Sequence, residues 1–297
     1  MRMAYVGRFA PTPSGPLHFG SLVTALASYL DARAAGGTWL LRIDDLDRPR
    51  VRPGAEERIL SQLSAHALDW DGPLRRQSEH RPAYARAIED LCRAGLTYSC
   101  TCSRAQLQGR RPPSEADEAV YPGVCREAGH PDVGAALRLR LPTGNLTYDD
   151  LSLGPQRRTS QLDIGDFVIR RRDGHASYQL ACAVDEAAQG ITDVVRGSDL
   201  VASTLRQIEV SRALGQPLPR YRHLPLVVDA HGRKLSKRDD ATAVREETAT
   251  LNLLAALRCL GQAVLHDAEH LNPATVLAHA ICRWRPQDIP PDRLEMA

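Results

Sequence analysis

The sequence contains almost no lysine. Of its 38 basic residues, only Lys234 and Lys237 are lysines, and both lie in the segment GRKLSKR. The formal net charge of +2 excludes a strong overall field for nucleic acid, so any RNA contact must come from local arginine clusters. Two ammonium groups in one glycine-flanked loop suit a polyphosphate whose charge rearranges during a reaction, although a solvated basic loop has the same pattern.

Long apolar runs are absent as well. No stretch approaches the roughly 20 residues that a membrane-spanning helix requires, and MRMAYVGRF lacks the apolar core of a secretory signal. We therefore expect a cytoplasmic protein without membrane association. The seven cysteines should stay reduced in that compartment, so their spacing carries more information than their pairing.

Apolar periodicity predicts an α/β fold with a Rossmann-type parallel sheet. MAYVGRFA and TWLLRIDD are typical of buried strands, and helical patterns cover residues 21–37, 54–69 and 80–95. This alternation favours a parallel sheet with helices on its faces. Later in the chain we expect sheet-like segments at 166–174 and 176–197, a helix over 203–214, and a short helical region at the end.

The character of the chain changes near Thr97, where cysteines and a loop rich in proline and glutamate begin. We expect residues 1–96 and 166–243 to form the two halves of one catalytic domain. Residues 97–165 should form an inserted subdomain, and residues 244–297 should be helical.

The stretch GRFAPTPSGPLHFGS turns sharply between the first strand and the first helix. The first turn of a helix has unpaired N–H groups and attracts anions. Gly15 and Gly20 would let a ligand approach the backbone closely, and His18 could donate a hydrogen bond to a phosphate oxygen. A plain strand-to-helix connection has the same composition, so this corner alone leaves both interpretations open.

Three cysteines have the spacing of metal ligands. Cys100, Cys102 and Cys125 could close most of a tetrahedral zinc site, although three unrelated thiols would look similar. Ordinary zinc chemistry makes His130 the first choice for a fourth ligand.

PLHFGS and KLSKR together resemble the HIGH and KMSKS signatures of class I aminoacyl-tRNA synthetases. GRFAPTPSGPLHFGS, LLRIDDLDRPR, VVRGSDL and HLPLVVDAHGRKLSKR resemble the glutamyl and glutaminyl branch in particular. The resemblance implies ATP, with Mg²⁺, as a substrate. The catalytic residues would be Lys237, which leads at the transition state, and His18, Ser21 and Lys234, although Ser21 departs from the last position of HIGH. The implied ATP-binding residues are His18, Gly20, Ser21, Lys234, Leu235, Ser236 and Lys237.

The resemblance also implies a pocket for L-glutamate. Arg8 ends the first strand, where open α/β sheets bind ligands, and an arginine can discriminate a carboxylate from the amide of glutamine. Asp44 stands where the family has glutamate and is one methylene shorter, so its contact with the substrate ammonium is expected to be looser. The full implied set is Arg8, Ala10, Thr12, Asp44, Tyr178 and Arg196.

The spacing C-x-C…Y-x-x-x-C resembles a zinc site in small members of the family. There a tyrosine completes the shell, which favours Tyr121 over His130. The metal would be structural, because it would order an insertion too small to build its own core.

Only about 55 residues follow the KLSKR region, too few for an anticodon-binding domain. This truncation, the zinc pattern and HFGS resemble the glutamyl-Q tRNA(Asp) synthetases. They imply activation of glutamate without tRNA and its transfer to queuosine at the wobble position of tRNA(Asp). The inserted subdomain would then bind the acceptor, the anticodon stem-loop, and the C-terminal helices would contact the stem. Arg48–Gly54 and VIRRRDG are weak candidates for RNA contacts, and we infer no obligate protein partner.

Three alternatives remain open from the sequence. A compact glutamyl-tRNA synthetase would charge a tRNA 3′ end, a nucleotidyl ligase of the HIGH superfamily would use no RNA, and a regulatory module would bind RNA without catalysis.

Overall fold

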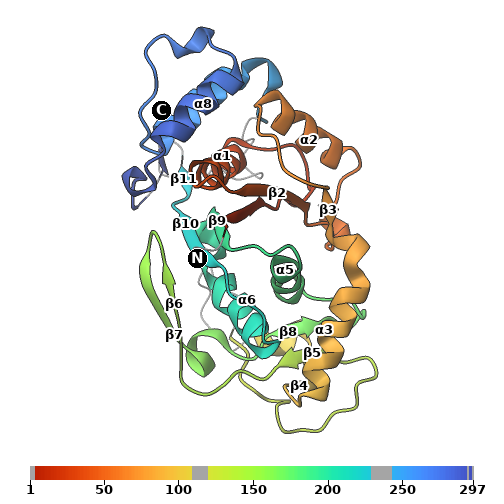
Figure 1. Ribbon diagram of the computed structural model, residues 1–297. Helices are drawn as coiled ribbons and strands as arrows, with labels where there is room; N and C mark the ends of the chain where they lie inside the picture. Colours follow the sequence, from red (N-terminus) through yellow and green to blue (C-terminus); the bar gives the residue numbers. More distant parts are fainter. Residues whose placement is uncertain (1–3, 109–119, 229–242, 293, 296–297) are drawn as a thin grey trace.

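A computed structural model describes residues 4–108, 120–228, 243–292 and 294–295 (Figure 1). Parallel strands form its centre, in the orders β1–β2–β3 and β9–β10–β6, with β7 antiparallel at the edge. The N–H of Thr192 donates to the Val6 carbonyl over 2.9 Å, so β1 and β9 are neighbours. The strands are β1 (Val6–Phe9), β2 (Thr38–Ile43), β3 (Arg75–Arg76), β6 (Asn145–Asp150), β7 (Gly154–Thr159), β9 (Asp193–Gly197) and β10 (Arg220–Leu224).

Helices cover both faces of these strands. In Figure 1, α1 and α8 lie on one side of β1 and β2, whereas α5 and α6 lie on the other. Leu22, Leu26 and Leu30 of α1 are fully buried with Trp39 of β2, and each such side chain stabilises the fold by about 1.5–3 kcal/mol. The helices are α1 (Phe19–Ala34), α2 (Ala55–Ala65), α3 (Arg81–Arg93), α5 (Tyr178–Ala188), α6 (Val201–Ala213), α7 (Ala249–Cys259) and α8 (Pro273–Arg283).

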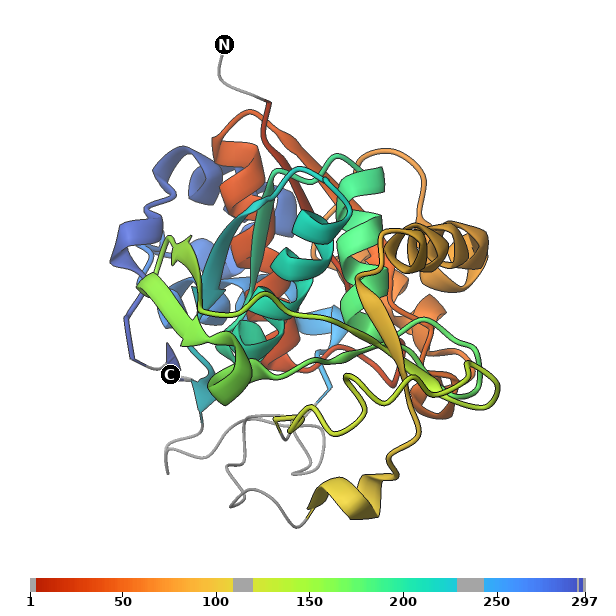
Figure 2. The ribbon, with the colours of Figure 1, turned by 90° about the horizontal axis from the view of Figure 1, so that it is seen from below.

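The C-terminal helices complete the main core beside α1. Leu253 and Leu257 of α7 and Leu277 of α8 are buried in the same cluster as the leucines of α1. Figure 2 shows these helices on one side of the molecule and α3 on the opposite side. The short strand β11 (Val227–Val228) pairs with β12 (Leu294–Glu295), so the end of the chain returns to the sheet region.

A smaller antiparallel sheet holds the cysteine-bearing segment. It has the order β4–β5–β8, with β4 at Thr97–Cys100, β5 at Ala136–Leu139 and β8 at Val168–Arg170. The short helix α4 (Arg104–Gln108) follows β4. The hairpin of β6 and β7 leaves this sheet, and β6 pairs with β10.

The structure confirms the parallel-sheet class and most of the predicted elements, but one prediction was wrong. Residues 176–197 were expected to be sheet-like, whereas Tyr178–Ala188 form helix α5 and only Asp193–Gly197 form a strand. The side chain of Ser177 caps the helix by accepting a hydrogen bond from Leu180 N–H over 3.3 Å. Alanine, leucine, glutamine and glutamate also favour a helix, and this preference outweighs the apolar appearance of the segment.

Across the described part of the chain, no helix combines the length and the apolarity needed to cross a bilayer.

Candidate active site

The carboxyl ends of β1, β2, β9 and β10 surround a cavity of about 610 Å³. From β1 the chain passes through α1 to β2 on one side, while β9 lies on the other side of β1. Open α/β sheets bind ligands where the strand order reverses in this way. Phe9, Asp44, Gly197 and Pro225, which end or follow these four strands, all line the cavity. The fold therefore creates a ligand site at the end of β1.

The corner between β1 and α1 forms one wall of this cavity. Nδ1 of His18 accepts a hydrogen bond from the Ser21 backbone N–H over 3.2 Å, which caps α1. A neutral ring then carries its proton on Nε2, which lies 2.9 Å from Ser21 Oγ. Gly20 also lines the cavity, so the helix N-terminus offers N–H groups and a hydroxyl to an anion.

The segment that follows KLSKR returns to the same corner. Ala243 pairs with His18 in a short antiparallel bridge, and the Val244 N–H donates to the Leu17 carbonyl over 3.0 Å. The side chain of Gln62 joins both, because it accepts from Leu17 N–H at 2.7 Å and donates to the Val244 carbonyl at 2.6 Å. Two segments more than two hundred residues apart thus lie side by side at the cavity.

The segment that precedes KLSKR reaches the cavity as well. Val227 of β11 lines it, and a Cβ built at Gly20 would lie 3.8 Å from the Val227 Cβ. Both ends of the stretch 229–242 therefore lie next to the β1–α1 corner. The predicted site residues in that stretch lie outside the described residues: Lys234, Leu235, Ser236 and Lys237.

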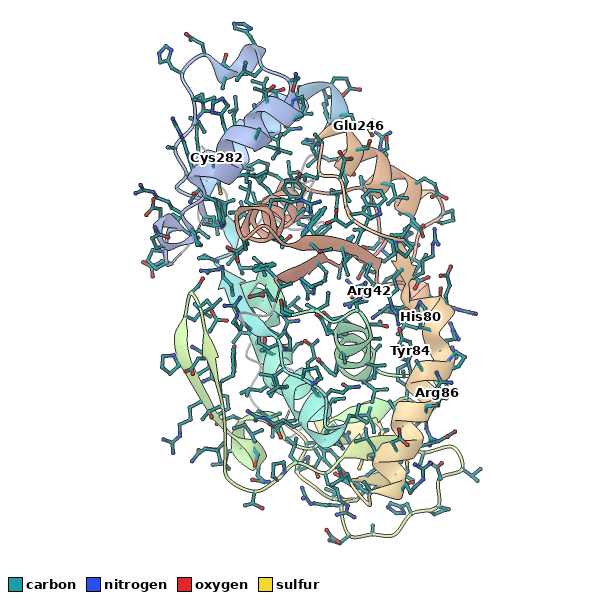
Figure 3. All side chains as sticks on the ribbon, in the orientation of Figure 1. Arg42, His80, Tyr84, Arg86, Glu246 and Cys282 are labelled. Atoms are coloured by element: carbon teal, nitrogen blue, oxygen red, sulfur yellow. The ribbon has the colours of Figure 1, made fainter. Side chains whose placement is uncertain are left out.

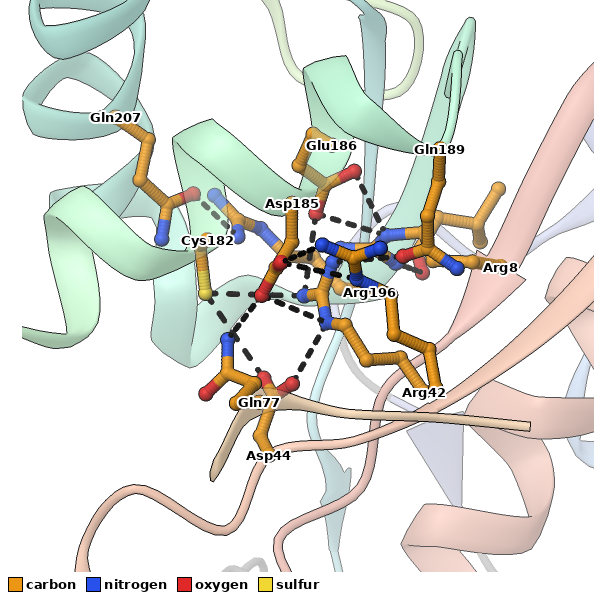
Figure 4. A network of polar contacts seen from close by, with 12 residues as sticks. Arg8, Arg42, Asp44, Gln77, Cys182, Asp185, Glu186, Gln189, Arg196 and Gln207 are labelled. Carbon is orange, nitrogen blue, oxygen red and sulfur yellow. Dashed lines mark hydrogen bonds and ion pairs between the residues drawn. The ribbon is translucent and has the colours of Figure 1, made fainter. Parts of the chain in front are cut away.

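A buried ionic network underlies the cavity (Figure 4). Nε of Arg8 donates to both carboxylate oxygens of Glu186, at 3.0 and 3.1 Å. Arg42 is fully buried, and its Nε donates to Asp44 at 2.7 Å while its Nη2 lies 3.5 Å from Glu186. Asp185, next to Glu186 on α5, lies 4.0 Å from Arg42 Nε. Figure 3 shows Arg42 between β2 and α5. The cationic and anionic side chains therefore hold one another in place beneath the ligand space.

The net pKa shift differs between two carboxyl groups of this network, although burial opposes ionisation of both. Burial raises the pKa of Asp44 above its ordinary value despite the neighbouring Arg42. It also opposes ionisation of Glu186, but the charges of Arg8, Arg42 and Arg196 outweigh it and lower the pKa of that carboxyl. Glu186 is therefore a fixed anion, whereas Asp44 ionises less readily and gains from a cation in the cavity.

Arg196 on β9 is held by neutral groups only. Its Nη1 donates to Gln207 Oε1 at 2.8 Å, its Nη2 to Thr204 Oγ1 at 2.7 Å, and its Nε to His223 Nε2 at 3.2 Å. Among the described residues no carboxylate contacts this guanidinium, which lines the cavity.

All six residues predicted for glutamate line this one cavity. Tyr178, at the start of α5, is 40% exposed, whereas the charged members are almost fully buried. Arg8 differs from expectation in one respect. Its Nε already donates to Glu186, so only its terminal nitrogens are left for other partners, and Nη1 lies 3.4 Å from the Val195 carbonyl. The six are Arg8, Ala10, Thr12, Asp44, Tyr178 and Arg196.

The structure also brings the predicted metal ligands together. The sulfurs of Cys100, Cys102 and Cys125 lie within 4.8 Å of one another, and this cluster of possible ligands contains no histidine. The Tyr121 hydroxyl lies 3.5 Å from Cys100 Sγ and 3.7 Å from Cys102 Sγ, and Cys102 and Cys125 are 3.4 Å apart. Sulfur ligands at 2.3 Å from a tetrahedral zinc are separated by about 3.8 Å. The donor set therefore fits a metal ion, and His130 is not part of it.

Two neighbours prepare these groups for a cation. Burial alone would raise the pKa of the Cys125 thiol, but hydrogen bonds, the one from Tyr121 foremost, lower it to about 6. The guanidinium of Arg138 lies over the Tyr121 ring, 3.6 Å from its centroid, where its positive charge favours negative charge on that ring.

Several residues of the site were missed by sequence reasoning. Asp185 and Glu186 form the acidic side of the network, and the only signal for them was a pair of acids inside the apolar run ACAVDEAA. Gln207 and His223 lie 11 and 27 residues from Arg196 in the sequence, and no local pattern marks them as its contacts.

These features define the catalytic domain of a class I synthetase, and comparison with known proteins agrees. The family model for class I tRNA synthetases (E and Q), catalytic domain, matches residues 5–269. The chain belongs to this family of ligases, the glutamyl and glutaminyl type of aminoacyl-tRNA synthetases.

Individual relatives identify the group within this family. Glutamyl-Q tRNA(Asp) synthetase from Pseudomonas aeruginosa (strain LESB58) is 49% identical over 290 residues, which cover 98% of this chain and 97% of the relative. The protein of the same name from Ectopseudomonas mendocina is 50% identical over 293 residues, with 99% and 97% covered. The chain therefore groups with the glutamyl-Q tRNA(Asp) synthetases, as its motifs indicated.

Among solved structures, the chain resembles a glutamate tRNA ligase from Elizabethkingia meningosepticum in complex with its amino acid. The TM-score is 0.81 at 26% identity, and the match covers 99% of this chain and 67% of that one.

Proposed function

We propose that this ligase activates L-glutamate with ATP in the absence of tRNA and then transfers the glutamyl group to queuosine at the wobble position of tRNA(Asp). One observation carries the proposal. A single cavity is lined by the six residues expected for glutamate and by the β1–α1 corner, and the described residues on either side of the stretch 229–242, Val227 and Ala243, lie at that corner.

Activation needs little acid–base chemistry from side chains. An oxygen of the α-carboxylate of glutamate attacks the α-phosphorus of ATP. The bond between the α-phosphorus and the β-phosphate breaks, pyrophosphate leaves, and glutamyl-adenylate is the product. Orientation and charge stabilisation supply the rate, and well-oriented reactants reach effective molarities of about 10⁵–10⁸ M. The magnesium ion enters with ATP as part of the substrate.

The residues around the cavity would have the following roles. His18, Gly20 and Ser21 hold the phosphates at the start of α1, and Lys234 and Lys237 neutralise the departing pyrophosphate. Arg8 and Arg196 would face the side-chain carboxylate of glutamate, and Asp44 its ammonium group. Two observations support this arrangement: Arg196 has no contacting carboxylate among the described residues, and the raised pKa of Asp44 favours a cationic partner.

The acceptor would be the anticodon stem-loop of tRNA(Asp). Transfer forms an ester to queuosine and releases AMP. Arg50, in the short helix Arg48–Arg50, is exposed and lines the cavity, so it could meet an RNA phosphate near the bound adenylate. Arg172 of VIRRRDG instead donates to the Cys102 carbonyl over 3.0 Å, which favours a structural role for that residue.

We also propose that Cys100, Cys102, Tyr121 and Cys125 hold one structural zinc ion. When bound, the ion would join the segment that follows β4 to the loop that carries Cys125. Thiolate ligands require a reducing compartment, which favours the cytoplasm as the location of the protein.

Labelled glutamate tests the proposed acceptor. The protein should transfer it to queuosine-containing tRNA(Asp) and not to tRNA(Asp) that lacks queuosine. Mild periodate treatment of queuosine-lacking tRNA destroys the diol of the 3′-terminal ribose and so controls for charging at that end. Equal transfer to tRNA(Asp) with and without queuosine, lost after periodate treatment of the queuosine-lacking tRNA, would instead identify a conventional glutamyl-tRNA synthetase.

A further inference from the structure

Asp150 and His223 form a fully buried pair behind the cavity. Asp150 ends β6 and His223 lies on the neighbouring strand β10, and both side chains are inaccessible to solvent. Nδ1 of His223 lies 2.5 Å from Asp150 Oδ2. On the other side of the ring, Nε2 lies 3.2 Å from Arg196 Nε and 2.9 Å from Thr204 Oγ1. The pair therefore connects a buried carboxylate with a cavity arginine.

The contacts determine which ring nitrogen carries the proton. Arg196 Nε can only donate, so Nε2 of His223 must accept and the proton must lie on Nδ1, facing Asp150. Burial lowers the pKa of His223, which keeps the ring neutral and preserves this acceptor. The Tyr221 ring stacks on the imidazole with an interplanar angle of 9° and restrains its plane.

The oxygens of Asp150 are fixed as well. Oδ1 accepts from the backbone N–H groups of Ser152 and Leu153, each at 2.9 Å, and of His223 at 3.3 Å, so Oδ2 is the oxygen turned to the imidazole. Burial disfavours the charged form of Asp150, but the hydrogen bond from His223 and these backbone bonds outweigh it and lower its pKa. The carboxylate thus stays an acceptor toward Nδ1.

Arg196 depends on this arrangement more than the other arginines of the cavity do. Arg8 and Arg42 contact carboxylates directly, and those ion pairs orient them. Arg196 contacts only three neutral acceptors among the described residues, which leaves one N–H on each terminal nitrogen for a ligand. Its charge is therefore available for an anion in the cavity, and its orientation depends on His223, Thr204 and Gln207.

We propose that Asp150 and His223 are positioning residues that hold Arg196 in the orientation in which it binds the side-chain carboxylate of glutamate. This inference rests on the proposed function and adds a relay, Asp150 to His223 to Arg196, that touches no substrate itself. Its effect is on glutamate binding, because the relay fixes the guanidinium before the substrate arrives.

Asp150→Asn is the sharpest variant, because it is nearly isosteric. Its amide oxygen can keep the three backbone hydrogen bonds, and its NH₂ group then faces Nδ1 of His223. The imidazole must move its proton to Nε2, where an N–H would oppose the N–H of Arg196. Thr204→Val is a second variant of similar volume, which removes the acceptor of Arg196 Nη2 and the hydroxyl beside His223 Nε2 but leaves the bond between Asp150 and His223 in place.

The experiment measures glutamate-dependent ATP–pyrophosphate exchange and separates KM for glutamate, KM for ATP and kcat. We expect Asp150→Asn to raise KM for glutamate by about 10- to 100-fold and to leave KM for ATP unchanged, and Thr204→Val to act in the same direction. Asp193→Asn is the matched control, since Asp193 is a buried, ion-paired carboxylate on the same strand as Arg196 but does not line the cavity.

A KM for glutamate that stays at the wild-type value in both test variants would overturn the relay, as would an equal rise in Asp193→Asn. If Asp150→Asn does not fold, Thr204→Val alone decides. Wild-type protein that shows no exchange with glutamate would overturn the proposed function itself, and the relay with it.

Discussion

The cavity and the cysteine cluster are built in opposite ways. The cavity lies on the largest hydrophobic core of the molecule, where Leu22, Trp39 and Leu41 are fully buried. The cysteine cluster has a core of four buried side chains, three of which are proposed metal ligands: Tyr98, Cys100, Tyr121 and Cys125.

The difference shows what each region needs. Two apolar cores, one around α1 and β2 and one that includes α5, fix these elements firmly enough that Arg42, Asp44 and Glu186 can be buried with their partners already in place. Four buried side chains stabilise a fold weakly, so the cysteine segment requires a cross-link. A metal ion held by three sulfurs and a hydroxyl would supply it.

Removal of the metal should have the largest effect and should separate the two regions. Structural zinc contributes about 10–16 kcal/mol to isolated zinc-finger peptides. Here the pairing of β4 with β5 and the bonds from Arg126 to Asp166 also order the segment, so the loss should be a part of that amount. We expect metal analysis of the purified protein to find zinc. A chelator should then speed amide hydrogen exchange in β4 while the strands around the cavity stay protected.

Single variants identify the ligands. Tyr121→Phe should lose zinc more easily than wild type, His130→Ala should retain it, and Cys282→Ser, at an exposed cysteine elsewhere, serves as the control. Two results would refute the cross-link: purified protein free of zinc, or a rate of amide hydrogen exchange in β4 that is the same with and without the chelator.

Substitution of Arg8, which lines the cavity, should have the next largest effect on stability and should also change amino-acid preference. Arg8→Gln removes the Nε–H group that bonds both oxygens of the buried Glu186, and breaking such a pair costs about 3–5 kcal/mol in the free energy of unfolding. It should also weaken the preference for glutamate over glutamine. Urea unfolding and exchange assays with both amino acids measure the two effects.

The double variant Arg8→Gln/Glu186→Gln removes both charges and should regain part of the stability. Arg220→Gln is the control, because the Arg220 side chain is 58% exposed and its ion pair should contribute less than about 1 kcal/mol. Equal losses in Arg8→Gln and Arg220→Gln would contradict the difference between buried and exposed pairs.

Lys237→Ala tests the catalytic half of the account. Removing one group that stabilises transition-state charge typically lowers the rate about 10²–10³-fold. We expect exchange to fall by that factor, with the unfolding transition unchanged, because the loss concerns the departing pyrophosphate and not the core. Near-normal exchange kinetics would exclude the role given to Lys237.

Acid should produce the smallest effect, through buried histidines. His66 is fully buried, and burial lowers its pKa from 6.5. In the unfolded chain His66 therefore binds a proton near pH 6.5, whereas in the folded chain it stays neutral to a lower pH. The free energy of unfolding thus decreases as the pH falls below 6.5. The slope is at most about 1.4 kcal/mol per pH unit for each such histidine.

Urea unfolding of wild type and His66→Asn between pH 7 and pH 5 measures this contribution. The variant should show a shallower decline. Identical slopes would mean that His66 titrates alike in both states.

The parts of the site that local sequence determines were predictable. The corner before α1 and Asp44 after β2 follow from strand ends and turn residues, and the motif match adds Tyr178 and Arg196. Glu186 was missed because α5 was taken for a sheet-like segment, and an acid's role depends on the face it occupies. The pairing of Asp150 with His223 spans 73 residues and exists only because β6 joins β10, which no local pattern reveals.

The most direct test of the central claim is ATP–pyrophosphate exchange by the purified wild-type protein, with glutamate and without tRNA. The account predicts exchange that requires glutamate and is not supported by glutamine. Exchange that appears only when tRNA is added, or none with glutamate under either condition, would contradict the claim that this cavity forms glutamyl-adenylate by itself.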